Sequence, residues 1–209
     1  MNYKKLLFTE GLLTRFFAFL LTFWVLFVTT IVISHLSLPE GLLLGKITGG
    51  NLELSSNFFV STLQILTYNL ISIICIVIGS LFARRKKEKD IYHSYGANVL
   101  IVLAVLFGLV LGTNSFGIQV ENVSLLYKIL GLFDVTQRSA IWEITSIIMM
   151  TSVFSNKSLV FTTGKKTTTI KWKQLFFSKL EIGFIIVSLL FLVVGAIVES
   201  TAIYSVLSK

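Results

Sequence analysis

Residues 16–34 read FFAFLLTFWVLFVTTIVIS, a continuous apolar stretch without a charged side chain. An α-helix rises 1.5 Å per residue, so about 20 apolar residues cross the hydrocarbon core of a bilayer. The basic residues that precede the stretch, Lys4, Lys5 and Arg15, resemble the start of a signal peptide. The stretch is longer than the apolar core of a signal peptide, however, and no small-x-small cleavage site follows it. We therefore interpret it as an uncleaved membrane-spanning helix.

The same pattern recurs four more times along the chain. The second and third predicted spans cover residues 58–83 and 97–118, and the fifth covers residues 182–207. The fourth predicted span, residues 139–154, is shorter and contains several Ser and Thr residues. These segments predict an all-α polytopic transmembrane helical bundle of about five spans, with residues 1–209 forming a single transmembrane domain.

The composition supports a lipid-solvated surface. Only 13% of the residues are charged and the mean hydropathy is +0.87, whereas a soluble domain carries about 25% charged residues. The net charge of +8 does not indicate a nucleic-acid partner, because the basic residues fall in short segments between apolar runs. The single cysteine, Cys75, lies inside an apolar run and excludes a disulfide framework within the chain.

The basic residues also predict the orientation. Three segments on one side of the predicted topology, residues 1–15, 84–96 and 155–181, hold 14 of the 18 Lys and Arg residues. Since cytoplasmic loops carry the excess of Lys and Arg, the N-terminus is expected inside and the C-terminus outside. Losing the fourth span would place the basic segment 155–181 outside, so the charge supports that span too. A bacterial plasma membrane is expected, because the chain starts without a transit-like Arg- and Ser-rich leader.

Two segments are expected to lie along the membrane surface. Residues 121–134 place apolar side chains at helical spacing, which suits a short interfacial helix on the outer face. Residues 170–180 mix lysines with aromatic residues on the inner face, and such a mixture suits contact with anionic lipid. The alternative for the second segment is an ordinary lead-in to the fifth span.

Three residues form the predicted intramembrane polar site. A charge at the centre of a membrane helix costs about 2.5–3.5 kcal/mol, so Glu143 and Glu199 need a reason to be there. Their distances from the helix ends place both roughly 7–12 Å below the outer interface, where together they could hold a proton or a cation. Alternatively, each carboxyl group bonds a neighbouring helix or reaches the interface. Asn69, near the middle of the second span, is expected to join helices through its amide.

Gly108 and Gly112 form a small-xxx-small pair in the third span. Such a pair lets another backbone approach closely, either within the chain or in a homo-oligomer. Asn114, just beyond the pair, is expected to cap this helix.

Catalysis is not expected, and no catalytic residue, metal or cofactor is assigned. His35 and His93 fall on opposite membrane faces in the predicted topology, so they cannot share a metal ion. The sequence has no zinc-protease, nucleophile-elbow or phosphate-loop signature. Residues 164–167, Gly-Lys-Lys-Thr, resemble the end of a phosphate loop, but its first glycine is missing because position 159 is Leu.

Over residues 58–207 the chain resembles the stage II sporulation protein M family of bacterial membrane proteins. The resemblance rests on Tyr68-Asn69-Leu70 leading to Gly79, on FGLVLG at residues 107–112, on IWEI at residues 141–144 and on GAIVES at residues 195–200. The family places a glutamate at both of the last two motifs and usually has five spans. It also has a Pro-His-Gly run before the first glutamate, where this chain has Arg138-Ser139-Ala140, and a second asparagine near the one at position 69.

The resemblance implies a non-enzymatic membrane component of a larger assembly. Sporulation members resemble scaffolds for cell-wall hydrolases, whereas shorter relatives accompany gene sets for circular bacteriocins and are linked to peptide export or self-protection. We favour the bacteriocin-type role for this short chain, with the lipid bilayer, membrane proteins or a cationic peptide as partners. Two further hypotheses stay open: a permease subunit that works with a separate ABC-type ATPase, and a proton- or ion-coupled carrier that uses both glutamates.

Overall fold

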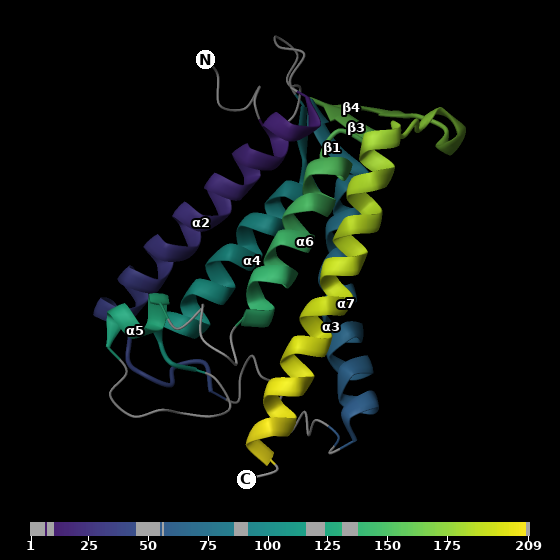
Figure 1. Cartoon of the computed structure of the whole chain (residues 1–209). Helices are drawn as coiled ribbons and strands as arrows, with labels where there is room; N and C mark the ends of the chain where they lie inside the picture. The colour runs from purple at the N-terminus through teal and green to yellow at the C-terminus, as the bar shows by residue number, and fades with distance from the viewer. Residues whose placement is uncertain are drawn as a thin grey trace.

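The computed structural model describes Leu7 and residues 11–44, 55, 57–85, 92–115, 124–130 and 138–207. Most of these residues are helical. Five helices form a bundle, and a six-residue helix lies at one end of it (Figure 1). The bundle consists of α2 (Leu12–Ser37), α3 (Phe58–Ser80), α4 (Tyr95–Gly112), α6 (Arg138–Phe154) and α7 (Lys179–Leu207), and the short helix is α5 (Leu125–Leu130).

Four of these helices, α2, α3, α4 and α7, are long and apolar enough to cross a membrane. α6, at 17 residues, is apolar but shorter. Each helix of the bundle runs in the opposite direction to the one before it in the chain (Figure 1). Large apolar side chains remain exposed on the outside of the bundle, among them Leu21, Ile33, Ile71 and Leu190. Apolar residues both inside the bundle and on its outer surface fit solvation by lipid, so this chain is a membrane protein.

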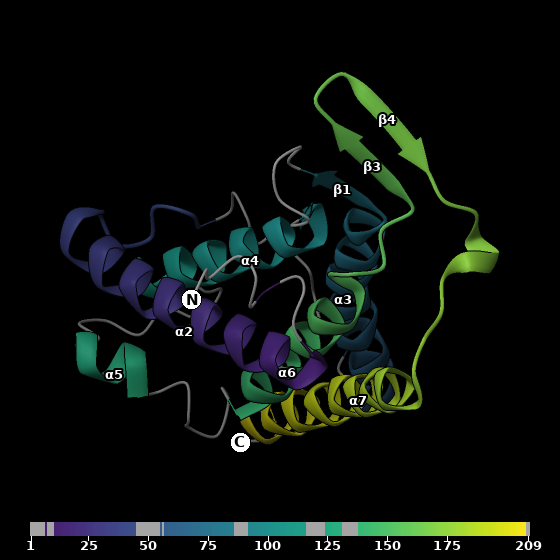
Figure 2. The ribbon, with the colours of Figure 1, turned by 90° about the horizontal axis from the view of Figure 1, so that it is seen from above.

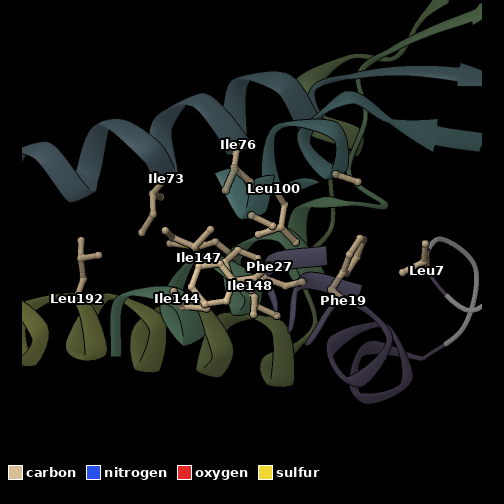
Figure 3. Packing of buried hydrophobic residues seen from close by; sticks show 14 of the residues in the cluster. Leu7, Phe19, Phe27, Ile73, Ile76, Leu100, Ile144, Ile147, Ile148 and Leu192 are labelled. Atoms are coloured by element: carbon tan, nitrogen blue, oxygen red, sulfur yellow. The ribbon is translucent and has the colours of Figure 1, made fainter. Parts of the chain in front are cut away.

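The core of the bundle is centred on α6. This helix packs against α2, α3, α4 and α7, and every residue from Ser146 to Val153 is buried. Figure 3 shows Ile144, Ile147 and Ile148 facing core residues from the other helices. Because protein rather than lipid surrounds α6, its Ser and Thr residues can bond inside the bundle, and this explains the weaker apolar signal of the fourth predicted span.

The all-α prediction is wrong in one respect, because a four-stranded sheet covers one end of the bundle. Its strands are β1 (Phe82–Arg85), β2 (Tyr92–Ser94), β3 (Val160–Thr163) and β4 (Lys166–Thr169), in the order β2-β1-β3-β4. β1 pairs antiparallel with β2 and parallel with β3, and β3 pairs antiparallel with β4. We call this end of the bundle the sheet end and the opposite end the α5 end (Figure 1).

The sequence of the β3–β4 hairpin explains why it forms strands. Both strands are rich in Thr, with Val and Phe at the start of β3, and these residue types fit a pleated strand. Gly164 has a φ of 61°, which suits the first position of a two-residue hairpin turn. The Gly-Lys-Lys-Thr run of residues 164–167 is therefore this turn and the start of β4, and no helix follows it as in a phosphate loop.

The sheet joins the ends of α3 and α6. The backbone N–H groups of Leu159 and Val160 both donate to the carbonyl of Leu81, at 2.8 and 2.9 Å. The hydroxyl of Ser158 donates to the carbonyl of Ser80 at 2.8 Å. The last turn of α3 and the segment after α6 are thus bonded to each other directly.

Two predicted spans end earlier than the sequence indicated. The second ends at Ser80, since residues 82–85 pair as a strand and cannot continue the helix. The third ends at Gly112, although its predicted last residues, 116–118, lie outside the described part of the chain. Asn114 has a φ of 49°, and the N–H groups of Asn114 and Ser115 donate to the carbonyls of Leu111 and Val110. These bonds satisfy carbonyl groups in the last turn of α4, so Asn114 takes part in capping the C-terminal end of this helix, as expected.

Of the two predicted surface segments, the structure describes the first in part and the second completely. Of residues 121–134, the structure describes residues 124–130, which contain α5. Residues 170–180 contain only the one-turn helix η2 (Trp172–Gln174) before α7 begins at Lys179. The rest of that segment is extended, because its backbone bonds to the sheet and to Lys157 instead.

Candidate functional site: a polar cluster between α3, α6 and α7

α6 and α7 pack closely along their length through small residues. The hydroxyls of Ser146 and Ser188 lie 2.9 Å apart, and Ser188 also donates to the carbonyl of Ser146 at 2.9 Å. The rings of Trp142 and Phe191 meet edge to face, with their centroids 5.1 Å apart. These contacts fix the faces that the two helices turn toward each other.

Glu143 lies in this interface, against a glycine of α7. A Cβ atom added at Gly195 would lie 2.9 Å from the Cγ atom of Glu143 and 3.4 Å from its Oε1 atom. The absence of a side chain at position 195 therefore provides the room that the Glu143 side chain occupies. From the third helix, α3, the amide of Asn69 donates to Oε1 of Glu143 at 2.5 Å.

Glu199 completes the cluster. It follows Gly195 by one helical turn, and its carboxyl group lies within hydrogen-bonding reach of that of Glu143. An ionised carboxylate is only an acceptor, so a hydrogen bond between the two groups needs one proton between them. Side chains in a helix point toward its N-terminus, and α6 and α7 are antiparallel, so the two carboxyl groups point toward each other along the interface.

Asn69 places the cluster at the middle of α3. Asn69 is separated by eleven positions from both Phe58 and Ser80, the two ends of α3, or by roughly 16 Å at each side. The prediction of 7–12 Å below the outer interface was measured from the ends of α6 and α7. α6 is short, and its first turn lies beside the middle of α7 (Figure 1). The depth of roughly 7–12 Å stays a prediction. All three side chains are half-buried.

The predicted packing glycines lie elsewhere, between α4 and α2. A Cβ atom at Gly108 would lie 2.9 Å from the carbonyl oxygen of Phe27, and one at Gly112 would lie 2.8 Å from that of Ile31. The hydroxyl of Ser34 reaches the carbonyl of Gly108 at 3.4 Å. The small-xxx-small pair therefore packs helices within the chain.

A cluster of charged side chains at the sheet end joins α2, α6 and α7 to one another. The sequence did not reveal this cluster. Arg15, only 4% exposed, donates from Nε to the carbonyl of Ser152 at 3.0 Å, and its NH2 lies 3.6 Å from Glu181. Lys157 Nζ lies 2.8 Å from the other Glu181 oxygen. The same oxygen accepts from the N–H of Ser178, while the Ser178 hydroxyl accepts from the N–H of Glu181.

These last two bonds are a capping box, and the pattern Ser-x-x-Glu before an apolar run was the signal that could have revealed it. The burial of Arg15 had no such signal, since its position beside the first span also suits an ordinary flanking charge. We call Arg15, Lys157 and Glu181 the sheet-end ion cluster.

A third polar contact lies at the α5 end. Lys128 of α5, 4% exposed, donates to the carbonyl of Gly112 at 2.9 Å and lies 3.2 Å from Glu40 and 3.0 Å from Nδ1 of His35. His93 lies in β2 at the sheet end, so the two histidines are separated, as predicted. Within the described ranges, no group of three or more His, Cys, Asp or Glu side chains is placed to hold a metal ion.

No protein-family model, curated protein or solved structure matches this chain.

Proposed function

We propose that the chain crosses a bacterial plasma membrane five times, with the sheet end in the cytoplasm. The sheet supports a fifth crossing, by α6. β1 follows α3 and β3 follows α6, and two strands can pair only if both lie on the same side of the membrane. α4 leads away from that side, so α6 must bring the chain back.

The basic residues support the orientation. The segments that meet at the sheet end are those that hold most of the Lys and Arg residues of the sequence, and such segments stay in the cytoplasm. α2 then runs outward from its start, and α7 ends on the outer side. This corresponds to the N-inside, C-outside arrangement.

Within this topology, we propose that the chain is a non-enzymatic component of a membrane assembly that secretes a bacteriocin-type peptide or protects its producer against it. The observation that carries the proposal is the meeting of three motifs on which the family resemblance rests. They lie far apart in the sequence, yet Asn69, Gly195 and Glu199 all lie against Glu143. A polar cluster in the middle of a membrane is costly and marks a functional site by default.

The permease-subunit hypothesis has less support. A permease that works with a separate ATPase needs a cytoplasmic coupling helix, and residues 170–180 would have to supply it in the proposed topology. They form one turn of helix within an extended segment. The scaffold for cell-wall hydrolases remains the nearer alternative, because it needs the same non-enzymatic membrane bundle.

The proton- or ion-coupled carrier is supported by one observation, the closeness of the Glu143 and Glu199 carboxyl groups. Glu143→Gln with Glu199→Gln keeps the size and polarity of both side chains but removes their acidic protons. Under the carrier hypothesis this double variant loses all function. Under the assembly hypothesis it still captures its partners, because amides preserve the hydrogen bonds between the helices.

The experiment that tests the assembly role is affinity capture from native membranes in mild detergent, with the captured proteins and peptides identified by mass spectrometry. Recovery of a bacteriocin-type peptide or an ABC-type ATPase with the wild-type chain is the expected result. Recovery of cell-wall hydrolases would replace this role with the scaffold. If none of these partners is recovered and the double glutamine variant loses the function of the wild-type chain, the carrier hypothesis replaces both the assembly role and the scaffold.

A further inference from the structure

After β3, the chain leaves the bundle sideways before it returns to begin α7. The β3–β4 hairpin and η2 extend outward from the sheet end of the bundle, rather than along the helix axes, and the two views agree on this (Figures 1 and 2). η2 stands apart from the bundle, and an extended segment leads from it back to the start of α7 (Figure 2). We call residues 164–180 the basic–aromatic strap.

The strap combines positive charge with exposed aromatic rings. It holds five exposed lysines, and no acidic residue occurs between Lys165 and Leu180. Trp172 and Phe176 are 66% and 84% exposed, and Ile170 and Leu180 are exposed as well. Exposing such large apolar side chains to water would cost free energy. The lysines are Lys165, Lys166, Lys171, Lys173 and Lys179.

Hydrogen bonds fix both ends of the strap. The N–H of Ile170 donates to the carbonyl of Leu159 at 2.8 Å, which ties its first part to the sheet. Lys157 donates to the carbonyl of Phe176 at 2.6 Å and lies 5.0 Å from the ring centre of Phe177. Lys157 also pairs with Glu181 at the start of α7. The strap is therefore held at the level where α7 enters the bundle.

We propose that the basic–aromatic strap lies in the headgroup layer of the membrane and binds anionic phospholipids. The positive charge of the strap indicates anionic phospholipids as its ligands, because lysines near a membrane surface attract anionic head groups. Trp and Phe side chains place their apolar rings at the boundary of the acyl chains, as in the aromatic belts of membrane proteins. The inference concerns a different part of the molecule from the polar cluster and does not depend on the peptide-related role.

The test uses Trp172 as its own reporter. The chain has three tryptophans, so Trp24→Phe with Trp142→Phe leaves only Trp172. The full chain is reconstituted into vesicles of phosphatidylcholine and phosphatidylglycerol, with bromine on the acyl chains of only one of the two lipids. We expect several-fold stronger quenching of Trp172 per brominated phosphatidylglycerol than per brominated phosphatidylcholine.

Lys171→Gln with Lys173→Gln removes the two lysines beside Trp172 and should lower this preference several-fold, since each lysine near the surface accounts for about fivefold. The matched control, Lys46→Gln with Lys209→Gln, removes the same charge from segments that the topology places on the other side. It should keep the preference. Equal quenching by both lipids, or no quenching by either, would overturn the proposal.

Trp24 packs against Phe23 and Phe27, so the single-tryptophan chain needs a second measurement in case it does not fold. Native mass spectrometry of the unmutated chain counts the phospholipids retained after gentle delipidation. Retention of phosphatidylglycerol by the wild-type chain and its loss in the Lys171 and Lys173 double variant is the expected result. Equal retention by both chains would contradict the role of these lysines.

Discussion

Glu143 can enter the interface of α6 and α7 because position 195 carries no side chain. The Cβ atom of an alanine there would come within 2.9 Å of Glu143 Cγ, closer than carbon atoms pack. The Glu143 side chain would have to move, and its bond to Asn69 would be weakened or lost. One methyl group therefore tests whether the cluster depends on this contact.

Gly195→Ala should destabilise the chain by about 1–3 kcal/mol, the usual cost of overpacking a well-packed interface. The measurement is thermal unfolding in detergent. Gly183→Ala is the matched control on the same helix, since nothing lies within 4 Å of the added Cβ atom. It should be neutral or slightly stabilising, because alanine favours helix more than glycine. Equal melting temperatures for the two variants would contradict the described contact.

At the scale of residues, the sequence singled out Glu143, Glu199 and Asn69 correctly as polar groups within apolar helices. It could not show that they meet, because their contact depends on the rotation of three helices about their axes. That rotation is set by packing, as at Gly195 and at the Ser146–Ser188 contact. Arg15 and Lys128 were missed for the same reason, because a loop charge and a buried charge look alike in a sequence.

Among the elements, α4 depends on its glycines for its approach to α2. Gly112→Ala would place a Cβ atom 2.8 Å from the backbone oxygen of Ile31, and backbone moves less readily than a side chain. We expect a lower melting temperature and an unchanged mass by light scattering in detergent. A change of oligomeric state without a loss of stability would instead assign the glycine pair to an interface between chains.

The sheet-end ion cluster fixes α2, α6 and α7 to one another. Glu181→Gln would remove the carboxylate that faces both Arg15 and Lys157, and removing one partner of a buried ion pair costs on the order of 3 kcal/mol. Added salt should not reproduce the loss, because buried pairs are screened weakly. Lys179→Gln, an exposed charge in the same turn, is the control and should melt within about 0.5 kcal/mol of the wild type. Similar losses in the two variants would contradict the cluster.

The helices could be predicted from the sequence better than the strands. An apolar run of about 20 residues has few alternatives in a membrane, so the spans of α2, α3 and α7 were identified within a few residues. β1 and β2 are only four and three residues long, and β3, which pairs with β1, lies far away in the sequence. No local pattern contains that pairing, so the sheet was not foreseen.

For the whole molecule, the parallel pairing of β1 with β3 is the link between fold and topology. It makes the exits of α3 and α6 neighbours, which requires an even number of crossings between them. In the proposed topology α4 and α6 supply two crossings, although α6 alone is too short to be identified as a span by length. In the same proposed topology the polar cluster lies near the middle of the membrane, between three crossing helices.

Cysteine labelling with a membrane-impermeant maleimide tests this topology most directly. Cys75 is the only cysteine, so Cys75→Ser provides a background for the single substitutions Arg84→Cys, Lys165→Cys and Glu40→Cys, all at exposed positions. The five-span topology predicts labelling at position 40 in intact bacterial cells, and labelling at positions 84 and 165 only in inverted vesicles. Labelling of position 165 but not 84 in intact cells would place β3 and β1 on opposite sides, and would contradict both the crossing by α6 and the sheet.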